Sequence, residues 1–538
     1  MSQALSDAGQ LIQAGALHSS QTALILWAAA KLNASPAWLP TAFLALRADL
    51  SDAVFPDLAL SAWAVARLSP RHRPRDDFVA DLWHSTGAHL AALTPLTASQ
   101  LGFAVSAGLA VRPPDRWAEA YLQHTQSLLP QCAGGELRQI FSGVSLMPSV
   151  PADWLATFWT AVQARCQSPG GMSPAELTGV LQSAARMGCD IDAAAMDVIQ
   201  SAAEASITQY SNTALALLLW TLVKLGRVPD ELFLDSLVAE TRRRLEGAAS
   251  TAAAEVWTLE SLWLLLSSLA ELRHRPSNAW LHAFDAAALP LLGGASAKEL
   301  SRLVWSRAVL DAAPGAEWLQ AFDARCATEL KQFNTQGLAN TCWALVVLQA
   351  YDCAALPRLW ARWLGRMAAE AVSPLDWVQL AEVSLVAGRE RPGLLQEMHG
   401  GMADTARARL VDHAQRCHGG DSTSHNRVAA RLQSDLRVAF KRNKLCEQSA
   451  RTVDLALEPV DALRLAVMVD GPALFTRNTW QQTGPARLRD RALALAGWTV
   501  LVLPWFALEG LREPRALTAY IRRRLAEAAA AEVRRQAL

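Results

Sequence analysis

Tryptophan recurs at a nearly constant interval along the first three-quarters of the chain. Trp27 and Trp63 are 36 residues apart, and Trp305 and Trp343 are 38 apart. Leucine follows each of them by five residues, and Trp220 repeats the same pair. A period of 20–50 residues is typical of proteins built from stacked supersecondary units. The interval therefore constrains the fold more than any other feature of the sequence.

A second aromatic column follows 13 residues after the first. Proline precedes nearly every member by two to four residues, as it does when it opens a helix in its first turn. The repeated unit is therefore predicted to be a helix, a proline-marked turn and a second helix. The members are Trp117, Trp154, Phe233 and Trp318, with Trp38 and Trp280 in the same context.

About ten such units span residues 15–410, which predicts an α-solenoid. In this architecture a helix pair buries its apolar face only against its neighbours, so both tryptophan columns are predicted to lie in the core. Solenoids present extended surfaces that suit extended ligands. In several helical-repeat families each unit reads one RNA base with a few side chains.

Three segments carry a family resemblance: "PPDRW" (113–117), "VPADW" (150–154) and "PGAEW" (314–318). They resemble the repeat of octotricopeptide-repeat proteins, and "FNTQGLANTCWAL" (333–345) is similar to the repeat of their FAST-kinase-like relatives. The resemblance implies single-stranded RNA as the partner, together with other RNA-processing proteins, in a chloroplast or mitochondrion. No leader is evident, because Asp7 lies near the start and no arginine precedes Arg47.

Two sets of solenoid residues are candidate RNA ligands. Cations stand four residues after the first-column position and could follow a phosphate backbone, although cations also complement the dipole at a helix C-terminus. They are Lys31, Arg67, Arg186 and Lys224. Amides and hydroxyls near the starts of first helices could bind base edges, although they also cap helices. They are Asn334, Gln336 and Asn340, with Gln21, Asn212 and Thr213.

The pattern changes after a linker predicted at residues 411–420. Residues 411–538 hold about 20 Lys and Arg against about 13 Asp and Glu, a modest indication of a nucleic-acid module. Residues 422–443 are predicted to form a basic amphipathic helix. The short apolar segments 451–457, 463–469 and 498–505 are predicted strands, with helices at 484–497 and 516–535. We expect a small α/β domain at residues 421–538, after a solenoid at 1–410.

This domain resembles a RAP domain, an RNA-binding module found at the C-terminus of such repeat proteins. The matching segments are "VDLAL" (453–457), "VDGP" (469–472), "FTRNT" (475–479), "TG" (483–484) and "AGWTVLVLPW" (496–505). The RAP domain in turn looks like the restriction-endonuclease-type fold. The resemblance places Asp454 and Asp470 where metal-binding carboxylates would stand, but Met468 replaces the usual glutamate and Leu474 the usual histidine.

RNA binding without cleavage is therefore the leading hypothesis, with no metal and no cofactor. Arg477, Asn478, Arg487 and Arg491 are the candidate ligands, since arginine pairs bidentately with phosphate. The protein would stabilise, process or promote translation of an organellar transcript. Two alternatives stay open, a metal-dependent RNA endonuclease and a solenoid that binds protein partners. The eight scattered cysteines indicate reduced thiols, and no apolar run is long enough to cross a membrane.

Overall fold

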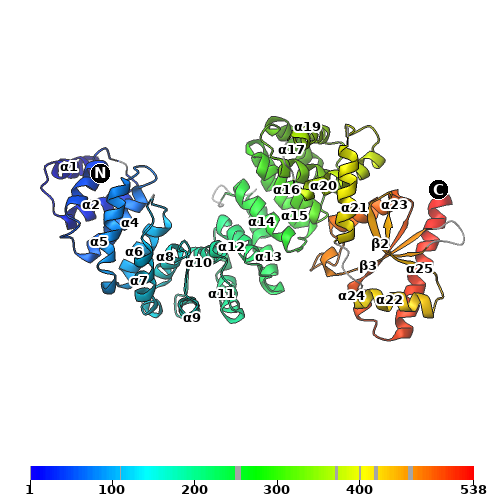
Figure 1. Ribbon diagram of the computed structural model, residues 1–538, viewed down its shortest axis with the longest axis horizontal. Coiled ribbons are helices and arrows are strands. Elements are labelled where there is room, and N and C mark those ends of the chain that lie inside the picture. Colours follow the sequence, from blue (N-terminus) through cyan, green and yellow to red (C-terminus); the bar gives the residue numbers. More distant parts are fainter. Residues whose placement is uncertain are drawn as a thin grey trace. The chain divides into compact units, whose positions relative to one another are not determined.

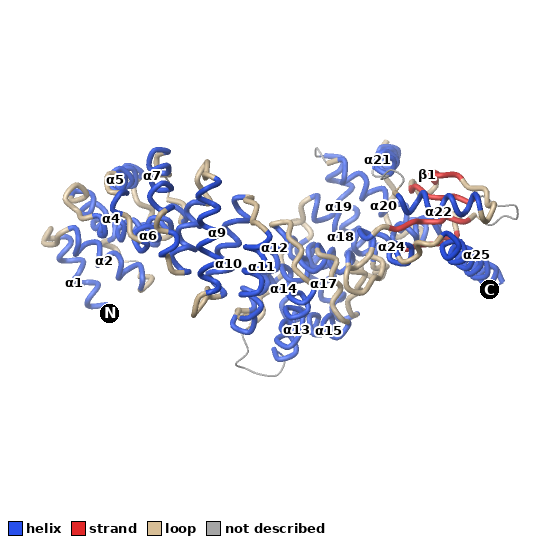
Figure 2. The backbone as a smooth tube through the Cα atoms, turned by 90° about the horizontal axis from the view of Figure 1, so that it is seen from below, coloured by secondary structure: helices blue, strands red, loops and turns tan. Residues whose placement is uncertain are grey.

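The computed structural model describes residues 2–34, 36–109, 111–248, 256–369, 373–398, 401–416, 422–457 and 464–537. The chain divides into two compact units, Met1–Thr241 and Arg242–Leu538. Figure 2 shows helices along most of the chain and strands only in its C-terminal part.

Unit 1 consists of helices packed in two layers. The even-numbered first helices contact one another in succession from α2 to α12, and the odd-numbered second helices do so from α3 to α11. This arrangement confirms the predicted helix pairs. The helices are α1 (Ser2–Gln13), α2 (Ser19–Lys31), α3 (Leu39–Ala48), α4 (Phe55–Leu68), α5 (Asp76–Gly87), α6 (Pro95–Ser106), α7 (Asp115–Gln126), α8 (Gly134–Val144), α9 (Ala152–Gln167), α10 (Pro174–Met187), α11 (Ala193–Ala205) and α12 (Asn212–Lys224), followed by α13 (Glu231–Ala248).

Hydroxyl groups link successive repeats to the second aromatic column. Thr86 of α5 accepts a hydrogen bond from the indole of Trp117 in α7, and Thr125 of α7 accepts one from Trp154 in α9, both at 3.1 Å. Each hydroxyl also donates to its own helix, Thr86 to the carbonyl of Leu82. At these two successive steps the Thr–Trp pair satisfies a buried indole N–H. Leaving such a group unpaired would cost about 1–3 kcal/mol.

The two tryptophan columns differ in burial. All named members of the second column are at most 7 % exposed, which confirms the prediction for that column. In the first column Trp343 is buried, but Trp27 is 38 % exposed, and Trp63, Trp220 and Trp305 are half-buried. The predicted core position is therefore correct for Trp343 and wrong for Trp27, and the other three residues lie at the edge of the core.

Helix geometry explains why the first column lies at the edge of the core. In α4 the fully buried stripe includes Leu58, Ala62 and Val65. Trp63 follows Ala62 by one residue and so points about 100° away around the helix axis. The fixed period identified equivalent positions in successive repeats, but it carried no information on which way those positions face.

Unit 2 begins with four further helix pairs and ends with a sheet domain (Figure 1). The first helices α14, α16, α18 and α20 again pack on one another in succession. The helices of these pairs are α14 (Leu259–Glu271), α15 (Asn278–Ala288), α16 (Ala297–Val309), α17 (Ala316–Glu329), α18 (Thr335–Val347), α19 (Ala355–Ala369), α20 (Pro374–Glu390) and α21 (Met402–Arg416).

The C-terminal domain, residues 422–457 and 464–537, has a four-stranded mixed sheet of order β1-β2-β3-β4. β1 (Lys441–Cys446), β2 (Arg451–Leu457) and β3 (Leu465–Asp470) are antiparallel neighbours, and β4 (Thr499–Pro504) pairs parallel to β3. α23 (Gly484–Leu495) covers one face, and α22 (Thr423–Ser434) and α25 (Pro514–Ala537) cover the other (Figure 1). α24 (Trp505–Glu509) follows β4.

Two predicted elements in this region need correction, and one strand was not predicted. The predicted helix over 422–443 ends at Ser434, and β1 contains the last three of its residues. The strand was missed because "KRNKLC" is polar and mostly exposed, as edge strands often are. The predicted linker is helical over residues 411–416, which complete α21, while residues 417–420 lie outside the described part of the chain.

A row of left-handed residues ends three successive first helices of unit 2. Arg273, Asp311 and Gln349, which we call the repeat-end row, have φ of 54°, 50° and 54° and follow α14, α16 and α18 at intervals of 38 residues. Such a residue is a common way for a helix to end, because it turns the chain away while satisfying terminal carbonyls. The solenoid therefore presents the same turn at regular spacing.

The segment Pro472–Arg491 of the C-terminal domain, here the docking segment, contacts the ends of α14, α16 and α18 one after another. At the end of α14, the backbone N–H of Arg477 donates to the carbonyl of Arg273 at 2.8 Å. Asn478 accepts from the N–H of Arg275 at 2.9 Å and donates to its carbonyl at 2.8 Å. The side-chain amide of Asn478 thus bonds both the N–H and the carbonyl of Arg275, as the backbone of a neighbouring strand would.

The next two repeats contact α23. Gly484 lies so close to the end of α16 that a Cβ would stand 1.8 Å from the carbonyl oxygen of Ala308. Arg487 forms an ion pair with Asp311 at 3.0 Å. At the end of α18, Arg491 donates to the carbonyls of Val346 and Val347 at 3.0 and 2.9 Å.

Arg491 also binds Glu390 of α20 and the hydroxyl of Tyr351. Burial raises the pKa of Glu390, but the bonds from Arg491 and Tyr351 outweigh it and leave that pKa below its usual value. Since the folded-state pKa is lowered, this pair stabilises the fold above the usual glutamate pKa of about 4.3. The contribution is lost as pH falls through the folded-state value.

We predict that Arg491→Ala lowers the free energy of unfolding of unit 2 by about 3 kcal/mol, because Glu390 and two helix-terminal carbonyls lose a charged donor. Arg487→Ala, one turn earlier on the same helix face, is the matched control. Its side chain is 53 % exposed, so this variant should cost less than about 1 kcal/mol. Urea unfolding measures both, and equal losses would contradict a specific role for Arg491.

Candidate nucleic-acid interface

A polar pocket of about 220 Å³ lies between the first helices α16 and α18. Three predicted RNA ligands, Asn334, Gln336 and Asn340, line it together. Lys298 and Arg302 of the preceding repeat add two cations to the same pocket. The structure thus brings amide groups, which can bind base edges, next to cations, which can bind phosphate.

The pocket arises from equivalent positions in adjacent repeats. Lys298 and Gln336 are 38 residues apart, and so are Arg302 and Asn340. Sequence reasoning missed both cations, although the repeat period applied to Gln336 and Asn340 would have identified them. Stacking of α16 on α18 places each pair side by side. Comparing equivalent positions of adjacent repeats would therefore have predicted the pocket from the sequence.

The three amides differ in how they are used. Asn334 is the N-cap of α18 and accepts from the N–H of Gly337 at 2.7 Å, which is the alternative role considered above. Gln336 is exposed and donates to the oxygen of Asn340 at 2.9 Å. Gln379 of α20 donates to the same oxygen at 3.3 Å. Gln336 is therefore the amide best placed to meet a ligand.

Of the three other polar candidates, Gln21 forms a hydrogen bond at the start of its own helix and Asn212 is buried. Gln21 accepts from the N–H of His18 at the start of α2. Asn212 at the start of α12 is 1 % exposed. Thr213, the next residue, is exposed.

The predicted cation column lies in unit 1 and faces solvent. Lys31, Arg67, Arg186 and Lys224 are all exposed, each in the last turn of its first helix. The ammonium of Lys31 stands 5.8 Å from the ring centre of Trp27 and 5.2 Å from that of Trp63. Lys224 stands 5.7 Å from Trp220. Half-exposed aromatic rings and cations therefore occupy the same face, the two group types that hold single-stranded nucleic acid.

The four predicted ligands of the C-terminal domain all belong to the docking segment. Arg491 and Asn478 hold the solenoid, and Arg487 pairs with Asp311. Arg477 uses its backbone N–H there, while its side chain is exposed. Arg487 and Arg491 share a helix face, as predicted, but that face meets the repeat ends, so the structure does not bring the three arginines together on a common ligand. RNA binding by these residues stays a prediction.

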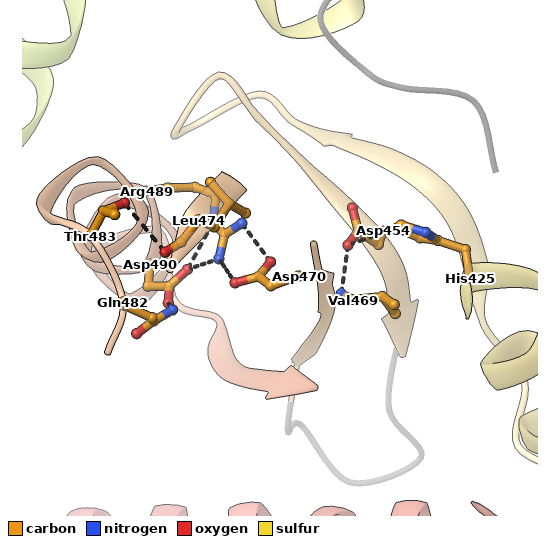
Figure 3. Close-up of polar contacts among 9 residues, drawn as sticks. All are labelled: His425, Asp454, Val469, Asp470, Leu474, Gln482, Thr483, Arg489 and Asp490. Carbon is orange, nitrogen blue, oxygen red and sulfur yellow. Dashed lines mark hydrogen bonds and ion pairs between the residues drawn. The ribbon is translucent and has the colours of Figure 1, made fainter. Parts of the chain in front are cut away.

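The two carboxylates of the nuclease alternative are engaged separately (Figure 3). Both oxygens of Asp470 accept from Arg489, each at 2.8 Å, and the side chain is 1 % exposed. Asp454 accepts from the N–H of Val469 at 2.7 Å and lies 3.2 Å from the His425 ring. A bidentate arginine on Asp470 occupies the oxygens that a metal would need. This geometry disfavours metal-dependent cleavage.

Arg489 was not predicted as a site residue, because only Arg487 and Arg491 stand at i and i+4 on one helix face. It also binds the neighbouring Asp490, which accepts from Gln482 at 2.8 Å (Figure 3). Burial lowers the pKa of Arg489, but the bonds to Asp470 and the charge of Asp490 raise it overall. Burial raises the pKa of Asp490, an effect that Arg489 opposes. The three groups form one buried, mutually dependent cluster.

The described residues contain no group of three or more His, Cys, Asp or Glu side chains arranged to hold a metal ion. Among the same residues, no helix has both the length and the apolarity needed to cross a membrane.

No protein-family model matches the chain, and no curated protein matches it. Among solved structures, the RNA-binding domain of yeast Puf5p bound to SMX2 RNA aligns with 72 % of this chain and 97 % of its own, at 11 % identity and a TM-score of 0.23. A homology model of the full-length AP-3 complex in an intermediate open conformation aligns with 78 % and 85 %, at 10 % identity and the same TM-score. At this TM-score neither likeness supports a conclusion about function. The resemblance to octotricopeptide-repeat and RAP-domain proteins stays a prediction.

We predict that Arg489→Met destabilises unit 2 by about 3–5 kcal/mol, because Asp470 and Asp490 are left as buried, unpaired charges. Asp490, whose pKa burial already raises, should then have a still higher folded-state pKa. Since the unfolded state binds fewer protons, the loss of stability relative to the unmodified protein should be smaller at pH 5 than at pH 7, which urea unfolding at the two pH values measures. Adding Asp470→Asn should recover part of the loss, and a pH-independent loss would contradict this account.

Proposed function

We propose that the protein binds single-stranded RNA along the face of its stacked first helices, with the pocket between α16 and α18 as a base-reading site. The observation that carries the proposal is this pocket, in which Gln336 and Asn340 of one repeat meet Lys298 and Arg302 of the preceding one. Phosphate contacts position a nucleic acid and base contacts specify it, and both kinds of group are present.

The aromatic residues of the first helices support the same proposal. In unit 1, Trp27 is 38 % exposed, and Trp63 and Trp220 are half-buried. Each of these rings lies close to a lysine. In unit 2, Lys298 stands 5.6 Å from the ring of half-buried Trp263. Bases stack on such rings with about 1–3 kcal/mol each, whatever their sequence.

The resemblance in sequence extends the proposal to a biological setting. The repeat segments and the RAP-like segments are similar to those of proteins that act on organellar transcripts. We therefore propose a transcript of a chloroplast or mitochondrion as the target, which the protein stabilises, processes or helps to translate. RNA cleavage is the less favoured activity because Arg489 holds Asp470.

We predict two distinguishable effects on RNA affinity. Lys298→Gln with Arg302→Gln should weaken binding to every RNA and flatten the salt dependence by about 1–1.4 units of log Kd per log salt, since each charge contributes about 0.7 on single strands. Gln336→Ala with Asn340→Ala should cost about 1–2 kcal/mol on the best RNA and far less on random RNA. Filter binding or fluorescence anisotropy at several salt concentrations measures both.

Arg358→Gln with Arg362→Gln on the second helix α19 is the matched charge control and should leave RNA affinity nearly unchanged. Absence of RNA binding by the intact protein would refute the proposal and favour a protein-binding solenoid. Equal effects of the control pair and of Lys298 with Arg302 would refute the assigned site. Mg²⁺-dependent cleavage that Asp454→Asn abolishes would establish the endonuclease instead.

A further inference from the structure

A second cavity, of about 350 Å³, lies where the C-terminal domain meets α18, α20 and α21. The solenoid supplies Trp343, Glu382 and His413 to its lining. β2, β3 and α23 supply the opposite side. Since both parts of unit 2 form the walls, the cavity depends on the docking of the C-terminal domain.

The cavity combines apolar walls with polar groups. Trp343, Met468 and Leu488 are buried residues that line it. The indole N–H of Trp343 donates to Glu382 at 3.0 Å, and Glu382 pairs with Arg451 of β2. These bonds fix the orientation of the tryptophan ring.

Polar groups of the sheet complete the lining. Thr452 is half-buried, and Asp454 keeps one oxygen on the N–H of Val469. An apolar slot with a few fixed hydrogen-bonding groups suits a flat ring with polar edges. The volume of about 350 Å³ is at the small end of the range for ligand pockets. Proteins that recognise single-stranded RNA place unstacked bases against aromatic side chains in this way.

One helix face connects this cavity with the pocket between α16 and α18. Gln336, Asn340 and Trp343 stand at positions i, i+4 and i+7 of α18, which lie on one side of a helix. Gln336 and Asn340 line the pocket, and Trp343 lines the cavity. Seven residues of helix span about 10 Å, so the two sites are neighbours along one face.

The neighbouring helix follows the same path. Gln379 of α20 contacts Asn340, and Glu382, three residues later, contacts Trp343. A ligand strand held by the amides and cations of the pocket would therefore reach the cavity directly. A separate small molecule would not explain this continuity.

We propose that the cavity takes one unstacked base of the bound RNA, with its ring against Trp343 and its edge toward Thr452 and Asp454. This inference rests on the proposed RNA-binding function. It gives the C-terminal domain a role in recognition that differs from that of its arginines. The base site exists only when the C-terminal domain is docked on the solenoid. Recognition of this base therefore depends on the docking contacts.

Photocrosslinking of the full-length protein to a random-sequence single-stranded RNA pool containing thiouridine tests the proposal. Mass spectrometry that assigns crosslinks to single residues should find them at Trp343 or Met468, in addition to those at Gln336 or Asn340. Two variants fill the cavity from different sides, Leu474→Trp from the docking segment and Thr452→Phe from β2. Each should remove the cavity crosslinks, keep those at the pocket, and weaken the best RNA about tenfold.

Leu436→Trp is the matched control, because Leu436 is also half-buried but packs on the opposite face of the sheet. This variant should bind and crosslink like the unmodified protein. If RNA crosslinks to the pocket but not to the cavity, and both filled variants keep full affinity, the cavity proposal is wrong while the proposed function stands. If the intact protein binds no RNA, both are wrong.

Discussion

The guanidinium of Arg491 holds together three elements that are far apart in the sequence. It closes the end of α18 by binding the carbonyls of Val346 and Val347, and it neutralises Glu390 of α20. Carbonyl groups at a helix end have no partner within the helix, so a charged donor there both satisfies them and complements the helix dipole. Because Arg491 belongs to α23, the same contacts fix the sheet domain on the solenoid, and with it every wall of the cavity beside Trp343.

The regularity of the repeat makes this docking possible. The repeat-end row presents Arg273, Asp311 and Gln349 at equal intervals, and the docking segment contacts the end of each helix in turn. Two of the segments that resemble the RAP domain, "FTRNT" and "TG", thus supply Asn478 and Gly484 to the interface. In this protein those residues hold the solenoid, and they do so within a single compact unit.

The sequence predicted the parts of the fold that follow from local chemistry. Proline-opened helices and a buried second aromatic column were recognised because the period and the apolar pattern agree. Strand β1 was missed because a polar edge strand has no apolar alternation, and Trp63 was placed in the core because a period does not report direction. Arg487 and Arg491 were correctly placed on one helix face. Their partners could not be found, since Glu390 lies 101 residues earlier and only the tertiary fold brings it near.

The sequence predicted the amide residues of the candidate site but not its cations. Asn334, Gln336 and Asn340 do line one pocket, as a shared ligand would require. Lys298 and Arg302 were not predicted, because they join the pocket only through the stacking of α16 on α18.

Hydrogen–deuterium exchange of the full-length protein, with and without a random single-stranded RNA pool, tests the central claim most directly. We expect the RNA to protect backbone amides of α16, α18 and strand β2, which lies beside the cavity, from exchange. Unchanged exchange in these three elements, in a protein that does bind the RNA, would contradict that claim.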